Sequence, residues 1–272
     1  MGLDAKDPII LIQSPYFPIR YWEAIYRRLR KGGYKVSLVE YPANDHITTP
    51  LLGGLQFDLQ VALKKKIPKQ GKAHLIAHGW AGLLVAYLSL EFKDHIRSVT
   101  LMSPLGVHTE LSTWEKITNW PWIGPKIGRL FGRKIWNDDF EGLAKSKVKR
   151  FSANRQATIL RANKILHKEG QQKFYEDLLE SDIEILILLG VKTRRYRQPI
   201  HPTFKHWRRD VLMVPIKKGE HFLSNEETED VFQALEKFWK YLKTAPKRTA
   251  VKKDHSRESG NYDSKFPRRN KA

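Results

Sequence analysis

The sequence has no cysteine and only three methionines, and its acidic residues are few compared with its basic ones. Without cysteine the chain cannot form disulfides, bind zinc through thiolates or use a thiol as a nucleophile. Long apolar runs are missing as well. The apolar run near the N-terminus covers residues 9–12, which is too short for a signal peptide or a membrane span. We expect a cytoplasmic protein, and no cofactor is predicted.

Positive charge is in excess over the whole chain. The 49 Lys and Arg residues outnumber 29 Asp and Glu, which gives a net charge of +20. Residues 245–272 hold nine basic and three acidic residues with few apolar ones, so we predict a basic, disordered tail. Such a charge attracts polyanions such as nucleic acid or acidic lipid, although a solvated basic surface explains it equally well. No helix-turn-helix, zinc-ligand or RNP-like pattern is present.

Short apolar segments alternate with amphipathic ones through most of the chain. The apolar segments are typical of buried strands, and they cover residues 8–13, 34–42, 72–78, 96–104, 183–190 and 209–216. Helical spacing occupies residues 19–33, 51–66, 82–92 and 227–242. This alternation predicts parallel βαβ units, and therefore an α/β fold with a doubly wound, mostly parallel sheet.

The alternation stops within residues 105–182, which contain helical patterns and no convincing strand. We predict that this segment is a helical cap inserted into a body formed by residues 1–104 and 183–244. Within the cap, residues 125–136 combine an apolar face with a basic one. That pattern is similar to a helix lying on anionic lipid, but it fits an ordinary cap helix with a solvated face better.

The polar residues that follow the predicted strands are the candidate functional residues, because open α/β sheets bind ligands at the carboxyl ends of their strands. They are Gln13, Ser14, Asp45, His46, His78, Gly79, Trp80, Ser103, Lys192, Thr193 and His221. Asp45 and His46 have the chemistry of metal ligands. Because they lack a regular ligand spacing, no metal site is predicted.

The segment LIAHGWAGLLVAYL joins a predicted buried strand to an apolar helix through Gly79. Here the chain resembles the α/β-hydrolase fold family, over roughly residues 8–242. His78, Trp80 and Gly82 match the pattern Gly-His-Ser-Trp-Gly-Gly that many members carry. In that family the serine of this turn is the nucleophile, and an acid and a histidine follow it in the chain. The resemblance implies that Gly79 stands at the nucleophile position.

The same resemblance assigns the other site positions. The family's acid lies in a Gly-x-x-Asp turn, where this chain has Thr193, and its histidine matches His221. The oxyanion hole would lie around Gln13 and Ser14, with a second backbone N–H from Trp80. One of the three triad members therefore remains.

The loss of the nucleophile decides the predicted function. Acyl transfer by this mechanism needs a hydroxyl whose proton the imidazole can accept, and Gly79 has no side chain. An oxyanion hole alone leaves a rate that is lower by orders of magnitude. Glycine adopts strained backbone angles at low cost, so the substitution preserves the turn. We predict a non-catalytic protein with a degenerate triad that binds a small ligand or a protein partner.

Two other interpretations stay open. His221 could activate Ser14, Ser103 or a water molecule, which would make the chain an active hydrolase of esters or related acyl compounds. Alternatively, the protein is a peripheral one that associates weakly with nucleic acid or an anionic membrane surface through its basic tail and cap.

Overall fold

The structure, a computed structural model, describes residues 7–13, 19–39, 60–104, 171–191, 211–219, 223 and 227–244. Its elements in chain order are β1 (Ile9–Ile12), η1 (Ile19–Trp22), α1 (Glu23–Lys31), β2 (Val36–Val39), β3 (Ala73–His78), α3 (Trp80–Glu91), η2 (Lys93–His95), β4 (Ile96–Met102), α7 (Gln171–Glu180), β5 (Glu184–Gly190), β6 (Leu212–Ile216) and α10 (Thr228–Thr244). Residues 60–66 are also helical. None of the helices in this part of the chain is both long and apolar enough to cross a membrane.

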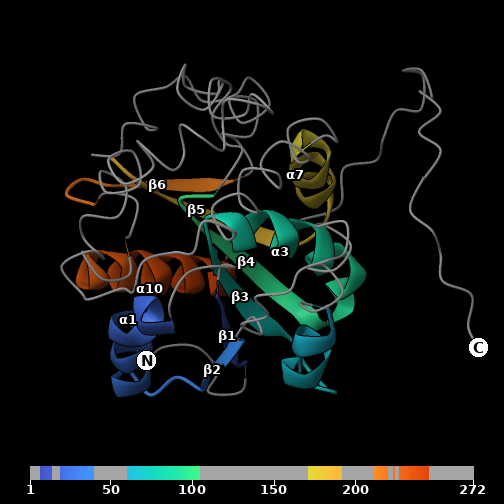
Figure 1. The fold of residues 1–272 in the computed structure, drawn as a ribbon, viewed down its shortest axis with the longest axis horizontal. Helices are drawn as coiled ribbons and strands as arrows, with labels where there is room; N and C mark the ends of the chain where they lie inside the picture. Colours follow the sequence, from blue (N-terminus) through green and yellow to red (C-terminus); the bar gives the residue numbers. More distant parts are fainter. Residues whose placement is uncertain are drawn as a thin grey trace, which may run out of the picture.

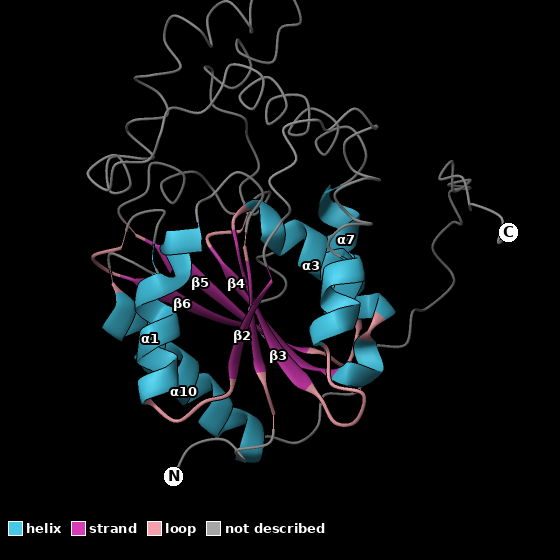
Figure 2. Ribbon diagram, turned by 60° about the horizontal axis from the view of Figure 1, so that its bottom comes forward, coloured by secondary structure: helices cyan, strands magenta, loops and turns pink. Residues whose placement is uncertain are grey.

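The strands form one sheet in the order β2-β1-β3-β4-β5-β6, and each neighbouring pair is parallel. The connection through α1 runs from β1 to β2, whereas the connection through α3 runs from β3 to β4 in the opposite direction. Because parallel crossovers are right-handed, the two helices must cover opposite faces, as Figure 2 shows. The winding therefore reverses between β1 and β3, which is where such sheets bind ligands.

The sheet separates two hydrophobic cores, with α1 and α10 on one face and α3 and α7 on the other (Figure 1). Along β1 the side chains alternate between them. Ile9 and Leu11 belong to the core under α1 and α10, which we call the α10 core, and Ile10 and Ile12 belong to the α3 core. Covering both faces requires apolar residues at successive positions of each strand. This explains the unbroken apolar runs of the sequence.

The helices α3 and α10 differ in how much of their surface is buried. In α3, most residues from Ala81 to Ser89 are buried, because the helix lies between the sheet and α7. By contrast, α10 buries one face only, which consists of Val231, Phe232, Ala234, Leu235, Phe238 and Trp239. Trp22 and Trp239 are among the largest fully buried side chains, and they remove a large apolar area from water. The aromatic side chains therefore make the α10 core a major source of stability.

The predicted α/β class with a doubly wound parallel sheet is confirmed. Each predicted strand contains one strand of the sheet. The helix predicted from Gly82 begins at Trp80, since Gly79 both ends the strand and caps the helix. Of the predicted cap, only residues 171–182 are described, and there α7 packs against α3 in the α3 core. The rest of the cap and the tail, residues 245–272, lie outside the described residues.

Candidate functional site

Three of the predicted site residues lie directly after neighbouring strands at the same edge of the sheet. Gln13 follows β1, Gly79 follows β3 and Ser103 follows β4. Each donates its backbone N–H to a carbonyl of the adjacent strand. Gln13 donates to Val39 at 3.0 Å, Gly79 donates to Met102 at 3.0 Å, and Ser103 donates to Leu188 at 2.8 Å. These bonds hold the three residues at the carboxyl end of the sheet. The structure thus brings these predicted site residues to one edge.

Gly79 forms the sharp turn between β3 and α3. Its backbone has φ 53° and ψ −116°, a combination that glycine adopts readily and that strains any residue with a Cβ. Its carbonyl accepts a hydrogen bond from the N–H of Gly82 at 3.1 Å, which closes the first turn of the helix. The strained turn expected from the sequence is therefore present at this residue, and it presents backbone without a side chain.

Gly82 allows the start of α3 to approach β4 closely. A Cβ at this position would lie 3.3 Å from Cβ of Pro104 and 3.5 Å from Cδ2 of Leu101. The first distance is shorter than most real Cβ contacts and the second is an ordinary contact, so Gly82 lies in a close-packed place. The short approach fixes the N-terminus of the helix beside the end of β4, and so fixes where Gly79 lies relative to Ser103.

His78 packs in an aromatic cluster on the α1 side of the sheet. It is fully buried, and its ring lies 4.5 Å from the ring of Tyr21, measured between centroids. The rings of Tyr21 and Trp22 in turn pack in a T-shaped arrangement, with their centroids 5.0 Å apart. His78 therefore packs against aromatic side chains beside the turn.

Ser103 is held in an unusual conformation. Its φ is 42°, which places a residue with a side chain in the left-handed region and costs of order 1–3 kcal/mol. Its Oγ atom is buried and has no hydrogen-bond partner among the described residues. Strain combined with an unsatisfied hydroxyl is a pattern that clusters at functional sites. Ser103 therefore has two features that are common at functional sites.

Two of the predicted oxyanion-hole residues, Gln13 and Trp80, differ in where their backbone N–H groups lie. The N–H of Gln13 is used within the sheet, so it is not a free donor for a developing negative charge. Trp80 is the first residue of α3, and the N–H groups of a first helical turn have no acceptor within the helix. The other predicted site residues, which are Ser14, Asp45, His46, Lys192, Thr193 and His221, lie outside the described residues.

A buried histidine–serine pair, not predicted from the sequence, joins β3 to β4. Nδ1 of His74, in β3, lies 2.7 Å from Oγ of Ser98 in β4. Burial, and to a smaller extent the charge of Arg97, lowers the pKa of His74 to about 3, so the imidazole is neutral. Its ring lies 5.5 Å from that of Trp239. The even spacing of His74 and His78 in a strand places both on one face and could have indicated this burial.

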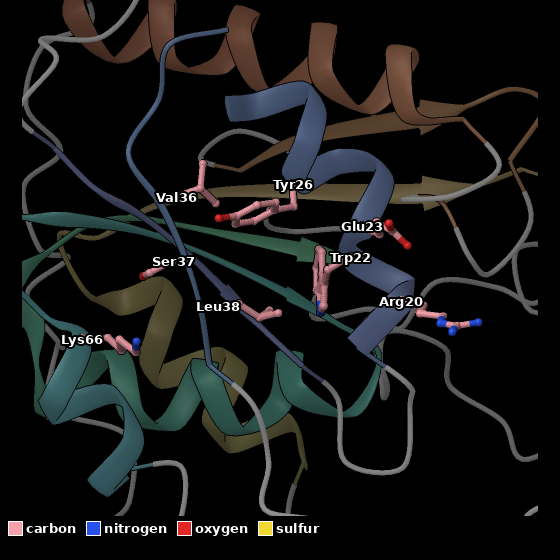
Figure 3. Close-up of a pocket in the computed structure, with 8 residues that line it drawn as sticks. All are labelled: Arg20, Trp22, Glu23, Tyr26, Val36, Ser37, Leu38 and Lys66. Carbon is pink, nitrogen blue, oxygen red and sulfur yellow. The ribbon is translucent and has the colours of Figure 1, made fainter. Parts of the chain in front are cut away.

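A groove beside β2 was also missed. It has a volume of about 520 Å³, and its lining residues are Arg20, Trp22, Glu23, Tyr26, Val36, Ser37, Leu38 and Lys66 (Figure 3). No local signal in the sequence indicates it, because it depends on β2 lying at the edge of the sheet that the described strands form. In the described ranges no three His, Asp or Glu side chains gather as a metal site requires.

Comparison with known proteins places this fold. No protein-family model and no curated protein matches the sequence. The structure of haloalkane dehalogenase DatA from Agrobacterium tumefaciens matches with a TM-score of 0.65 and 16% identity, over 87% of this chain and 90% of that one. Haloalkane dehalogenase DbeA from Bradyrhizobium elkani matches with a TM-score of 0.66 and 11% identity, over 90% of this chain and 94% of that one. A bromoperoxidase from Bacillus anthracis matches with a TM-score of 0.57 and 20% identity, over 86% of this chain and 92% of that one.

These neighbours have the α/β-hydrolase fold, and this chain has it too. The expected fold is therefore confirmed. A fold shared at such low identity does not carry a reaction with it, because one fold hosts many activities. The function has to be argued from the residues of the site.

Proposed function

We propose that the protein is a non-catalytic member of the α/β-hydrolase fold, and that the carboxyl edge of its sheet binds a small ligand or a protein partner. The observation that carries this proposal is Gly79. It lies in the turn between β3 and α3, with the backbone of a strained elbow, and offers no atom that could attack a substrate. Covalent catalysis at an elbow requires that atom.

The other triad positions agree with the same proposal. By the resemblance, Thr193 replaces the carboxylate that would orient the histidine, and His221 alone keeps its residue type. A histidine without a nucleophile or an orienting acid lacks both partners of the proton-transfer mechanism. Binding makes fewer demands, since the backbone N–H of Trp80, the first residue of α3, has no acceptor within the helix and can meet a polar group of a ligand.

A fluorophosphonate probe tests the proposal on the full chain, because it labels activated serines covalently. We expect no increase in the intact mass of the wild-type protein. The Gly79→Ser variant should also stay unlabelled, since Thr193 supplies no carboxylate, whereas combining it with Thr193→Asp restores the residue types of the whole triad. Covalent labelling of the wild-type protein would contradict a non-catalytic function.

The geometry of Ser103 favours a second candidate, an active hydrolase of esters or related acyl compounds with a relocated nucleophile. Its positive φ and buried, unpartnered hydroxyl support this alternative. Peptide mapping of the probe-treated protein distinguishes the two. An adduct on Ser103 that disappears in Ser103→Ala would establish the hydrolase. An adduct on Ser14 would instead place the nucleophile after β1.

The net charge of +20 supports a third candidate, peripheral binding of nucleic acid or anionic membranes through the tail and the cap. Binding to duplex DNA or to phosphatidylserine vesicles should then weaken steeply as salt rises, because each phosphate contact releases counterions. Deletion of residues 245–272 should reduce this binding. Binding that does not change with salt would contradict the candidate.

A further inference from the structure

One edge of β2 has no pairing strand among the described residues. Among the described residues β2 pairs with β1 alone. The carbonyls of Lys35 and Val39 accept hydrogen bonds from β1, from Ile9 at 2.8 Å and from Gln13 at 3.0 Å. Successive peptide groups of a strand point to opposite sides. The N–H and C=O groups of the even-numbered residues, Val36 and Leu38, therefore point away from β1 and toward the groove.

The groove runs along this edge between the two layers of helices. Figure 3 shows β2 in the middle, with side chains from η1 and α1 on one side and Lys66 from the helix of residues 60–66 on the other. Val36, Leu38 and Tyr26 pack against the α10 core, whereas Ser37 points to the opposite face. An added strand would thus find apolar neighbours on one face and polar ones on the other.

The charges at the groove select its occupant. Arg20 and Lys66 line it, and Lys35 is exposed just before β2. The only acid among the lining residues, Glu23, is paired with Arg27 at 2.5 Å. The groove is therefore positive, and a second copy of this chain would bring the same positive charges against it. An acidic segment matches this edge best.

We propose that β2 binds an extended, acidic peptide segment of a partner protein, which adds to the sheet as a further strand. Edge strands bind peptides in this way, with backbone hydrogen bonds providing affinity and alternate side chains providing specificity. The peptide's apolar side chains would lie beside Val36 and Leu38, and its carboxylates would lie toward Lys66. This surface is separate from the site around Gly79, so the proposal goes beyond the proposed function.

Two labelled peptides test the proposal with the full-length protein. One is acetyl-Gly-(Val-Glu)₃-Gly-amide, and its control replaces each Glu by Lys. We expect fluorescence anisotropy to show binding of the acidic peptide, weakening as salt rises, and no binding of the basic one. Absence of binding up to about 1 mM, or equal binding of both peptides, would overturn the proposal.

Substitutions then locate the binding. Leu38→Pro removes an outward N–H that β1 does not use, whereas Leu38→Ala removes the side chain and keeps the N–H. We expect Leu38→Pro to bind about tenfold more weakly than Leu38→Ala, as the loss of one backbone hydrogen bond requires. Lys66→Glu should weaken binding by about threefold or more, whereas Lys64→Glu, on the same helix outside the groove, should not. Equal affinities within either pair would contradict binding at this edge.

Amide hydrogen exchange of the wild-type protein gives an independent test that does not depend on the folding of a variant. The N–H groups of Val36 and Leu38 should exchange faster than that of Ser37 in the free protein, and should slow on addition of the acidic peptide. Unchanged exchange with the peptide bound would refute the proposal. So would self-association of the free protein that Leu38→Pro abolishes, because the occupant would then be a second copy.

Discussion

Replacement of Gly79 by alanine should destabilise the protein through its backbone alone. A residue with a Cβ at φ 53° and ψ −116° carries a strain of roughly 1–3 kcal/mol. Alanine also restricts the unfolded chain, which returns about 0.4–1 kcal/mol. The free energy of unfolding should therefore fall by about 1–2 kcal/mol. Gly79→Ser should behave similarly, since the strain comes from the Cβ and not from the hydroxyl.

Urea denaturation followed by tryptophan fluorescence measures this change, because Trp22 and Trp239 are fully buried and report unfolding of the α10 core. Gly82→Ala is the matched control, three residues further on. There alanine favours the helix by up to about 1 kcal/mol, and the contact of 3.3 Å with Pro104 opposes this gain. We expect the control to remain within about 1 kcal/mol of the wild-type protein.

A Gly79→Ala variant as stable as the wild-type protein would refute this reasoning. The turn would then not have the strained backbone described above, and glycine would have no conformational reason to stand there. The proposal that the elbow is preserved while its chemistry is lost would lose its physical basis. Similar losses in Gly79→Ala and Gly82→Ala would instead indicate general intolerance of this helix start.

Two further predictions concern the interior. The pKa of His74 is about 3 in the folded state, below its value of about 6.5 in the unfolded chain. Its contribution to stability is therefore full above pH 6.5, and it falls by about 1.4 kcal/mol per pH unit as the pH drops toward 3. The destabilisation caused by His74→Phe should accordingly be about 2 kcal/mol smaller at pH 5 than at pH 7 in urea titrations, and an equal difference at both pH values would contradict the burial of a neutral imidazole. The second substitution, Gly219→Ala, places a Cβ against the side chain of Leu223 and 3.0 Å from Cγ2 of Ile216. It should lower the free energy of unfolding by about 1–3 kcal/mol. A variant of wild-type stability would show that this turn has more room.

The sequence could predict the sheet because its central strands are covered on both faces. Residues 9–12, for example, are apolar at every position and fully buried, and such short runs bounded by amphipathic helices have few other interpretations. The turn at Gly79 was predictable for a related reason. A sharp turn at the edge of the sheet is what a buried strand, a glycine and an apolar helix in direct succession predict.

Other features could not be predicted because they depend on which strands become neighbours. The pairing of His74 with Ser98 joins residues of two strands whose register only the folded sheet fixes. The positive φ of Ser103 leaves no trace in the residue type, since serine is common in ordinary turns. The open edge of β2 follows from the strand order, and a strand of four residues has the same sequence pattern at an edge as in the middle.

The two cores have a consequence for redesign of the site. No side chain belongs to both the α3 core and the α10 core among the described residues, and substitutions on opposite sides of the sheet should therefore have nearly additive effects on stability. The start of α3 packs in the α3 core, away from Phe238 and Trp239. Stabilising substitutions around these two residues could offset the strain of a serine at the elbow. An active site could thus be rebuilt at the elbow while substitutions in the α10 core keep the protein folded.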